Sequence, residues 1–296
     1  MKWFSERLYS YFAQMIAVDD VLHRNRSMHQ DIRVYDTPLF GKMLVLDGAV
    51  QLTELDNHIY HELMAHVPLF AHGAVADVLI LGGGDGGTLK EVLKHPVESV
   101  VMVEIDQAVI DVSREYFPDV SEEAFSDARV ELVVADAAEF VAREKRKFDL
   151  ILIDSTDPVG AGSSLFTRNF YLNCRSRLRA DGAVVAQSGT PLFAKQQSKG
   201  REDAFQSVFG RPEQFVALVP SYPTGMVALN GATLQAWSLN PPIILTRKRL
   251  ARSGICTRHY CPETHRGSFE VLGDAAGRAM RQSRAEVSVE QGRGMA

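Results

Sequence analysis

A loop of five glycines and one aspartate is the first stretch of the sequence whose residue types could do chemistry. It covers residues 82–87 and follows the apolar run of residues 78–81, which is typical of a strand buried in a parallel sheet. Glycines such as Gly82 and Gly84 let a ligand approach the backbone without meeting a Cβ atom. Glu104 follows at about the 20-residue spacing that suits a carboxylate accepting hydrogen bonds from ribose hydroxyls. The pattern therefore predicts a nucleoside-binding βαβ unit.

The aspartate inside this loop, Asp85, bears on which nucleoside is expected. Gly82, Gly84 and Gly87 also fit the dinucleotide fingerprint G-x-G-x-x-G, which would place a pyrophosphate at the start of the next helix. An acid at that point opposes a phosphate and favours a cation or a hydroxyl group. We therefore expect a cationic adenosine ligand of the sulfonium type. The alternative is a glycine-rich turn whose aspartate caps a helix.

Acidic residues follow each of the strands predicted at residues 77–81, 100–103, 130–134 and 149–153. They are Asp85, Glu104, Asp106, Asp136, Asp154 and Asp157. Because the carboxyl ends of parallel strands meet at one edge of a sheet, we expect these acids to converge there. Asp136 suits the exocyclic amine of an adenine, whereas Asp85, Asp154 and Asp157 repel one another and require cations, such as the ammonium groups of a polyamine. The alternative for Asp106 and Asp136 is that each caps the helix that follows it.

Two kinds of hydrophobic periodicity divide the chain. Apolar and polar residues alternate over residues 32–35, 41–46 and 49–53, and the hairpin signal Asp47-Gly48 separates the last two of these segments. Residues 1–65 are therefore predicted to form an N-terminal antiparallel β-domain that ends in a helix over residues 57–70.

Further along the chain, predicted strands alternate with helices. The strands are the four given above and a fifth at 183–187, which follows a turn at Asp181-Gly182, and the helices lie at about 87–95, 106–116, 136–145 and 167–179. Residues 66–296 are therefore predicted to form a Rossmann-like catalytic domain, an α/β doubly wound sheet of the methyltransferase type. Residues 215–219 and 226–229 are candidates for an antiparallel pair, and the tail from about residue 278 is expected to fray.

The composition is that of a soluble globular protein, with 296 residues, 46% hydrophobic and 23% charged, and a net charge of −5. This charge indicates neither a nucleic-acid partner nor a membrane surface, and no run approaches the ~18 apolar residues that span a bilayer. The first residues lack the apolar segment of a signal peptide, so we expect a cytoplasmic protein. Cys174, Cys256 and Cys261 fit reduced thiols, and a zinc site that adds His259 and His265 is the less favoured alternative.

The motifs GGGDGG, VEID, DSTDPVG and PSYPTG together resemble those of the polyamine aminopropyltransferases, most closely the spermidine synthases. HQDIRV, LVLDGAVQLTE and IYHELMAHVPL extend the resemblance over nearly the whole chain. The block GGGDGGTLKEVLKHPVESVVMVEID is more specific than a generic methyltransferase fingerprint. The resemblance implies decarboxylated S-adenosylmethionine as co-substrate, putrescine as acceptor, spermidine and 5′-methylthioadenosine as products, and no metal or other cofactor.

The resemblance also implies roles for individual positions. Donor-binding residues would be Gln30, Gly82, Gly84, Asp85, Glu104 and Asp136. Asp154 would be the catalytic acid or base, with Tyr60 and Tyr222 as its hydrogen-bonding companions. Contacts to the substrates would come from Tyr60, His61, Asp85, Asp154, Asp157 and Tyr222. The exposed edges of the N-terminal β-domain favour a homodimer or homotetramer.

Some positions depart from the family pattern, and other functions stay open. The loop D-P-x-G-P-x-E-S-L-F carries Ala161 and Ser163 in place of its second proline and its glutamate, so the preferred polyamine acceptor is open. An S-adenosylmethionine-dependent methyltransferase shares the α/β core but would need a loop that tolerates the donor's carboxylate, which Asp85 opposes. A module that senses polyamines or nucleosides would keep the acids but would not need Tyr60 and Tyr222.

Overall fold

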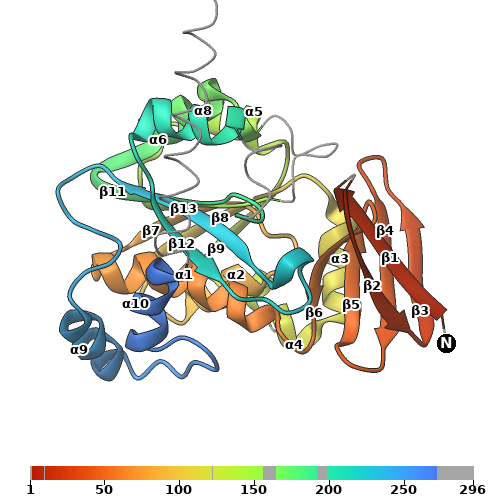
Figure 1. Cartoon of the computed structure of the whole chain (residues 1–296). Coiled ribbons are helices and arrows are strands. Elements are labelled where there is room, and N and C mark those ends of the chain that lie inside the picture. Colours follow the sequence, from red (N-terminus) through yellow and green to blue (C-terminus); the bar gives the residue numbers. More distant parts are fainter. Residues whose placement is uncertain (1, 10, 122, 156–164, 192–198, 272–296) are drawn as a thin grey trace, which may run out of the picture.

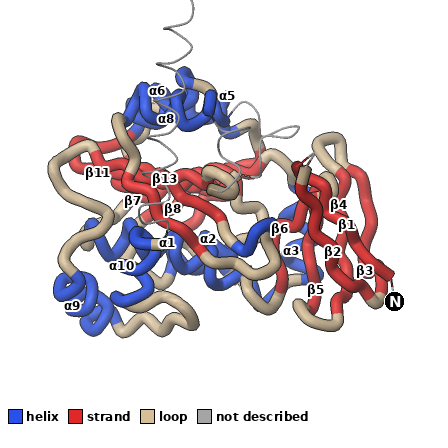
Figure 2. Tube along the Cα trace, in the orientation of Figure 1, coloured by secondary structure: helices blue, strands red, loops and turns tan. Residues whose placement is uncertain are grey.

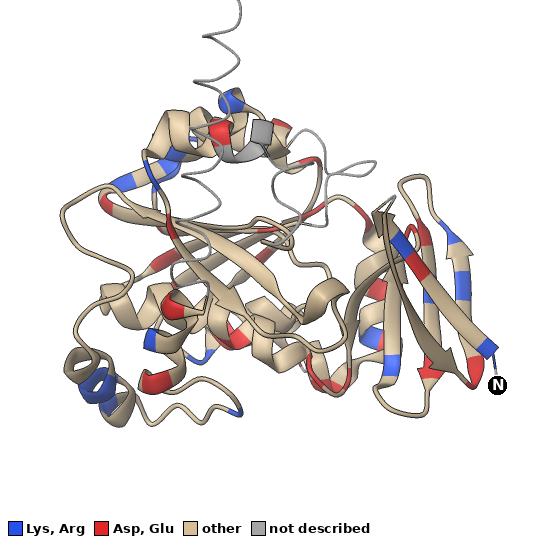
Figure 3. Ribbon diagram, viewed as in Figure 1, with Lys and Arg blue, Asp and Glu red and all other residues tan. Residues whose placement is uncertain are grey.

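The structure is a computed structural model that describes residues 2–9, 11–121, 123–155, 165–191 and 199–271 (Figure 1). Its strands form a two-stranded, a four-stranded and a seven-stranded sheet. The two small sheets lie together at one side of the large sheet and its helices (Figure 1). Basic and acidic residues are interspersed along the ribbon of both parts in the view of Figure 3. Within the described residues, no helix combines the length and the apolar character needed to cross a bilayer.

The N-terminal sheets hold six strands, where the sequence patterns predicted three. Strands β1 (Lys2–Tyr9) and β2 (Phe12–Val18) pair as a hairpin, and β3 (Asp20–Arg26), β4 (Asp31–Thr37), β5 (Gly41–Leu46) and β6 (Ala49–Thr53) form the four-stranded sheet in that order. Phe4 and Ile16 of the hairpin pack on Met43 and Val45 of the larger sheet. Strand β3 was missed because its side chains are mostly polar and exposed, such as Arg24, and so lack a clear apolar alternation.

The seven-stranded sheet has the order β12-β13-β11-β10-β7-β8-β9. Strands β7 (Asp77–Gly82), β8 (Ser99–Glu104), β9 (Val130–Val134), β10 (Phe148–Asp154) and β11 (Leu178–Gln187) are parallel, as predicted. Strands β12 (Glu213–Ala217) and β13 (Val227–Thr233) add the predicted antiparallel pair at one edge. The chain winds outward from β7 through β8 and β9, then returns to β10 on the other side of β7. The α/β doubly wound prediction is therefore confirmed.

Helices cover both faces of this sheet (Figure 2). On one face, α1 (Asn57–His72), α2 (Gly87–Leu93), α9 (Ile243–Ser253) and α10 (Pro262–Glu270) pack on side chains such as Ile80 and Leu152. On the other, α5 (Ala137–Arg143), α6 (Arg168–Arg177) and α8 (Lys199–Phe209) pack on side chains such as Leu81 and Ile153. Residues 79–81 and 151–153 are thus apolar throughout because both faces of their strands are covered.

Helix α3 (Gln107–Tyr116), with the short helix α4 (Pro118–Ser121), joins the two parts of the molecule. Val109 and Val112 of α3 pack on Ile32 and Leu44 of the four-stranded sheet. The short 3₁₀ helices at Ala124–Ser126 and Pro223–Gly225 complete the described helical segments. Helix α1 runs across residues 65 and 66, where the boundary between the domains was predicted, and the small sheets end at Thr53. The exact boundary stays a prediction.

One predicted turn was wrong. Asp181-Gly182 does not separate α6 from the last parallel strand, because β11 begins at Leu178, directly after the helix. The pairing of β10 with β11 instead shifts register between Phe148 and Leu150. Arg179 donates to Asp149 on β10 and to Asp77 on β7, which anchors the irregular start of β11 to the neighbouring strands.

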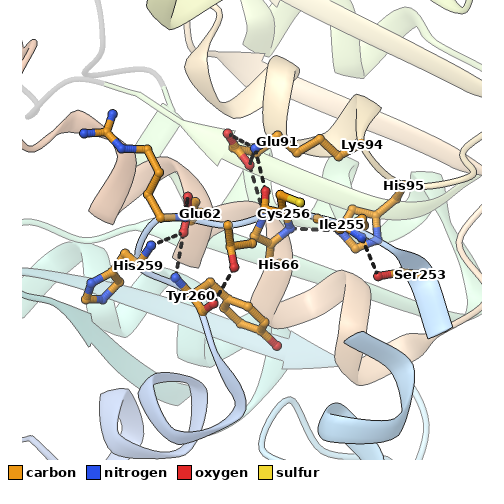
Figure 4. Close-up of polar contacts among 12 residues, drawn as sticks. Glu62, His66, Glu91, Lys94, His95, Ser253, Ile255, Cys256, His259 and Tyr260 are labelled. Atoms are coloured by element: carbon orange, nitrogen blue, oxygen red, sulfur yellow. Dashed lines mark hydrogen bonds and ion pairs between the residues drawn. The ribbon is translucent and has the colours of Figure 1, made fainter. Parts of the chain in front are cut away.

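A buried polar cluster fastens α1 to α2 and to the segment before α10 (Figure 4). The Glu62 carboxylate, fully buried, accepts hydrogen bonds from the backbone N–H groups of Arg258, His259 and Tyr260 at 2.6–2.8 Å. His66 Nε2 lies 3.0 Å from Glu91 Oε2. Burial acts to raise the pKa of Glu91, but its bonds to His66 and Lys94 hold that pKa at about 2. These contacts fix the helix that carries Tyr60 and His61.

Replacing Glu62 tests this anchoring. In Glu62→Gln, the side chain keeps one acceptor oxygen and turns an NH₂ group toward backbone N–H groups that need an acceptor. We expect the free energy of unfolding to fall by about 2 kcal/mol, since bonds to charged groups contribute ~1.5–3 kcal/mol each. Urea denaturation measures it, with Glu263→Gln, at an exposed position of α10, as the matched control that leaves the midpoint in place. An unchanged midpoint in Glu62→Gln would show that these bonds contribute nothing to stability.

Candidate active site

A pocket opens at the carboxyl ends of the parallel strands, between the large sheet and the N-terminal sheets. The structure brings ten of the predicted site residues to its wall: Gln30, Tyr60, His61, Gly82, Gly84, Asp85, Glu104, Asp136, Asp154 and Tyr222. Their roles stay predictions. Asp157, Ala161 and Ser163 lie outside the described residues, as does the tail from residue 278.

The centre of the pocket is the point where the winding of the sheet reverses. Gly82 ends β7 and pairs with Asp154 at the end of β10, and the Gly83 N–H donates to the Asp154 carbonyl oxygen at 2.8 Å. Gly82 has a φ of +90°, and a Cβ atom there would lie 2.1 Å from that carbonyl oxygen. Only glycine fits this backbone conformation and this contact. A crevice at such a switch point is where doubly wound sheets bind ligands.

The carboxylate of Asp154 is held at both oxygens. Tyr60 Oη on α1 donates to Oδ1, and Thr88 Oγ1 on α2 donates to Oδ2, each at 2.6 Å. Enclosure in the pocket and the nearby charge of Asp85 raise the pKa of Asp154 above its ordinary value, despite the opposing effect of His61 and of these two bonds. Asp154 is therefore a stronger base than an exposed aspartate, with a fixed orientation.

Asp85 is paired with a histidine. Its Oδ1 lies 3.2 Å from His61 Nε2 and accepts the Gly87 N–H at 2.7 Å. Enclosure acts to raise the pKa of Asp85, but His61 and the Gly87 N–H outweigh it and hold that pKa below the ordinary value. Burial acts to lower the pKa of His61, yet Asp85 raises it overall. Asp85 thus stays ionised beside a histidine that tends to carry a proton.

Glu104 lies deep against the glycine loop. A Cβ atom on Gly84 would come within 2.9 Å of Glu104 Oε2, so the loop and the carboxylate approach closely because Gly84 lacks one. Burial raises the pKa of Glu104 to about 7, although the Asp106 N–H donates to its Oε1 at 3.0 Å. Because this carboxylate is poorly solvated, it is stabilised by hydrogen bonds from hydroxyl groups, such as those of a ribose.

An aspartate that caps a helix can also line the pocket. Asp106 and Asp136 both cap helices: Asp106 accepts the Ala108 N–H, and Asp136 accepts the N–H groups of Ala138 and Glu139. Asp136 also lines the pocket. Asp106 does not line it, but accepts a hydrogen bond at 3.0 Å from the side-chain amide of Gln30, which does. One carboxylate therefore begins a helix and faces the ligand space.

Tyr222 reaches the pocket from the segment between β12 and β13. Its Oη donates to the Gln51 carbonyl oxygen of β6 at 2.5 Å, and its ring centroid lies 6.3 Å from that of Tyr60. The two tyrosines form the wall of the pocket nearest the N-terminal sheets. Tyr60 is buried, and its pKa is raised well above 10 by burial and by Asp154, so its hydroxyl keeps its proton.

Sequence reasoning missed two groups at the pocket. Thr88 was read only as the start of a helix, although it is the second residue of α2 and its hydroxyl donates to Asp154, which lines the pocket. Glu6 lies on β1, 2% exposed, and lines the pocket from the N-terminal hairpin. An acid on the inward face of a strand, between Phe4 and Tyr9, was the available signal, since such a position is otherwise apolar.

The zinc alternative finds no support. His265 is bonded through Nδ1 to the Tyr260 hydroxyl and through Nε2 to the Leu239 carbonyl oxygen, and Cys261 caps α10. In the part of the chain that the structure describes, no group of three or more His, Cys, Asp or Glu side chains is arranged to hold a metal ion.

The sheet topology and the acidic pocket define an α/β protein of the methyltransferase-like class with an added N-terminal β-domain. Residues 57–235 match the family described as "Spermine/spermidine synthase domain", and residues 2–54 match the "Spermidine synthase tetramerisation domain". The chain therefore belongs to the spermine/spermidine synthase family.

The sequence is similar to those of individual relatives over most of the chain. It is 42% identical to the polyamine aminopropyltransferase of Ruegeria sp. over 272 residues, which cover 92% of this chain and 96% of the relative. It is 40% identical to polyamine aminopropyltransferase 1 of Pseudomonas aeruginosa over 272 residues, 92% of this chain and 95% of the relative.

Solved structures give the same family. A spermidine synthase in complex with the transition state analogue AdoDATO superposes with a TM-score of 0.84 at 35% identity, covering 90% of this chain and 91% of that one. The spermidine synthase of Thermotoga maritima superposes with a TM-score of 0.83 at 34% identity, covering 91% of each chain.

Proposed function

We propose that this chain is a polyamine aminopropyltransferase of the spermidine synthase type. It transfers the aminopropyl group of decarboxylated S-adenosylmethionine to putrescine and releases spermidine and 5′-methylthioadenosine. No metal and no further cofactor takes part. The protein acts in the cytoplasm as a homo-oligomer, a dimer or a tetramer, and the match of residues 2–54 to a tetramerisation domain supports the assembly.

The charge of the pocket carries this proposal. Five carboxylic acids line it, and the described lining residues include no lysine or arginine: Glu6, Asp85, Glu104, Asp136 and Asp154. Like charges in a poorly solvated site are costly unless cations join them. The decarboxylated donor brings a sulfonium and an ammonium group, and putrescine brings two ammonium groups. The two substrates therefore supply the missing positive charge.

Each wall of the pocket suits one part of the substrates. Glu104 and Asp136 accept from the ribose hydroxyls and the adenine amine. Asp85 and Asp154 hold the ammonium group of the donor and the attacking end of the acceptor. Glu6, on the side of Tyr222 and Gln51, receives the distant ammonium group of the diamine.

The chemical step is a displacement at the methylene carbon beside the sulfonium. Putrescine arrives as an ammonium ion, since a primary amine has a pKa near 10, and it must lose one proton before it can attack. The raised pKa of Asp154 makes it the base that takes this proton. The nitrogen lone pair forms the new C–N bond while the C–S electron pair returns to sulfur. The leaving thioether is neutral and needs no acid.

A methyltransferase is the second function that the fold allows. S-adenosylmethionine carries a carboxylate at the position where the decarboxylated donor has hydrogen. Asp85, inside the glycine loop, and Asp154, at the end of β10, would face that group. The pocket therefore disfavours the methyl donor by repulsion.

Turnover with the two donors separates these functions. With putrescine and the decarboxylated donor, we expect spermidine and 5′-methylthioadenosine in equal amounts. S-adenosylmethionine should give a kcat/KM at least about 100-fold lower, which corresponds to ~2.7 kcal/mol. Mass spectrometry of the products checks both. A methylated amine, or equal use of the two donors, would replace this proposal with the methyltransferase alternative.

Asp154→Asn tests the assignment of the base. The amide keeps the shape and can still bond to Tyr60, but it cannot take the proton, so kcat should fall by roughly 10²–10⁴. Donor affinity, measured by calorimetry, should change less. Asp149→Asn, a carboxylate on the same strand that faces Arg179 away from the pocket, is the matched control. Wild-type kcat in Asp154→Asn would remove Asp154 from the chemical step.

A further inference from the structure

Gln14 on β2 lies directly opposite Glu6 on β1 in the N-terminal hairpin. It does not line the pocket, yet its side-chain amide contacts two groups that bear on it. Gln14 Nε2 donates to Glu6 Oε2 at 2.5 Å and to the Ser221 carbonyl oxygen at 2.9 Å. Ser221 precedes Tyr222. One NH₂ group thus joins the hairpin to the segment that carries a pocket tyrosine, across 207 residues of sequence.

The chemistry of these partners specifies an amide donor. A carboxylate and a carbonyl oxygen are both acceptors, and one NH₂ group has two hydrogens, so both are used. The other oxygen of Glu6 accepts the Val50 N–H at 3.3 Å. The Glu6 carboxylate is therefore held at both oxygens, much as Asp154 is at the other end of the pocket.

The far side of this bridge is also fixed. Ser221 is buried, and both its N–H and its hydroxyl donate to the Asp56 carboxylate, at 2.8 and 2.9 Å. Asp56 precedes α1, the helix that carries Tyr60. The Gln14 amide therefore connects Glu6 to a turn that is itself locked to the start of α1.

We propose that Gln14 is a positioning residue for the amine acceptor: its amide holds the Glu6 carboxylate and the Ser221–Tyr222 turn at a fixed separation. This inference rests on the proposed function. With its distant ammonium group at Glu6 and its attacking end at Asp154, the diamine lies between two fixed carboxylates, which places the attacking nitrogen at a defined distance from the donor. Without the Gln14 amide, the Glu6 carboxyl group loses one of the hydrogen bonds that orient it, so acceptor binding weakens while donor binding does not.

The test replaces the amide and keeps the shape. In Gln14→Met, we expect the KM for putrescine to rise roughly 10-fold, the change that corresponds to losing one hydrogen bond to a charged group. The calorimetric Kd of the decarboxylated donor should stay within about 2-fold. Gln14→Glu, a second variant of similar size, turns a carboxylate toward Glu6 and should raise the KM at least as much. Gln107→Met, at an exposed position of α3 where the amide is bonded to Asp111, is the matched control and should change neither constant.

A double-variant cycle separates positioning from a general loss of structure. If Gln14 acts through Glu6, adding Gln14→Met to Glu6→Gln raises the KM no further, within about 2-fold. Additive effects, a shifted donor Kd, an altered mass by light scattering, or an unchanged putrescine KM in both Gln14 variants would overturn the inference. The wild-type assay is read first: if the wild-type protein transfers no aminopropyl group, the proposed function fails, whereas an active wild type with unaffected Gln14 variants refutes only this step.

Discussion

The arrangement of the site depends on two carboxylates, Asp85 and Asp154, which are enclosed together at the switch point of the sheet. Each disfavours the ionisation of the other, and the pocket gives them little water. The neighbouring groups compensate for this repulsion in different ways at the two positions. Asp85 is kept charged by His61 and a backbone N–H, while Asp154, bonded to two hydroxyls, is left with a raised pKa. One acid is thus ready to bind a cation and the other to accept a proton.

The surrounding elements hold this arrangement in place. Tyr60 and His61 come from adjacent positions of α1, and Thr88 from α2, so the register of two helices decides the geometry of both acids. Glu62, the next residue of α1, ties that helix to the segment before α10. The N-terminal sheets then close the pocket with Glu6 and Gln51. Displacement of α1 would therefore disturb both carboxylates together.

Much of this site was readable from the sequence, because its key positions follow strands with strong apolar runs. The apolar runs over residues 78–81 and 150–153 indicate where β7 and β10 end. The carboxyl ends of parallel strands lie at the same edge of the sheet, so the residues that follow these two strands come together. Asp106 and Asp136 were correctly suspected of capping, and Asp136 caps its helix while it lines the pocket. Glu6 and Thr88 were missed for a different reason. Their contacts join elements far apart in the chain, and neither residue lies in a periodic pattern that reveals its partner. The irregular start of β11 likewise depends on Arg179 bonding to two neighbouring strands.

The central claim is that the five acids of the pocket outnumber the cationic groups beside them, of which His61 is one, until the ligands bind. The protons exchanged on binding measure this most directly. In the free protein, burial raises the pKa of Glu104 to about 7, and enclosure with Asp85 raises that of Asp154. A bound cation favours the ionised acids and lowers these pKa values, so protons must leave. Calorimetry of the decarboxylated donor from about pH 5.5 to 8, in buffers of different ionisation enthalpy, should show net proton release below about pH 7, with affinity that rises with pH and then levels off. Proton uptake, or binding without any proton exchange, would contradict the account.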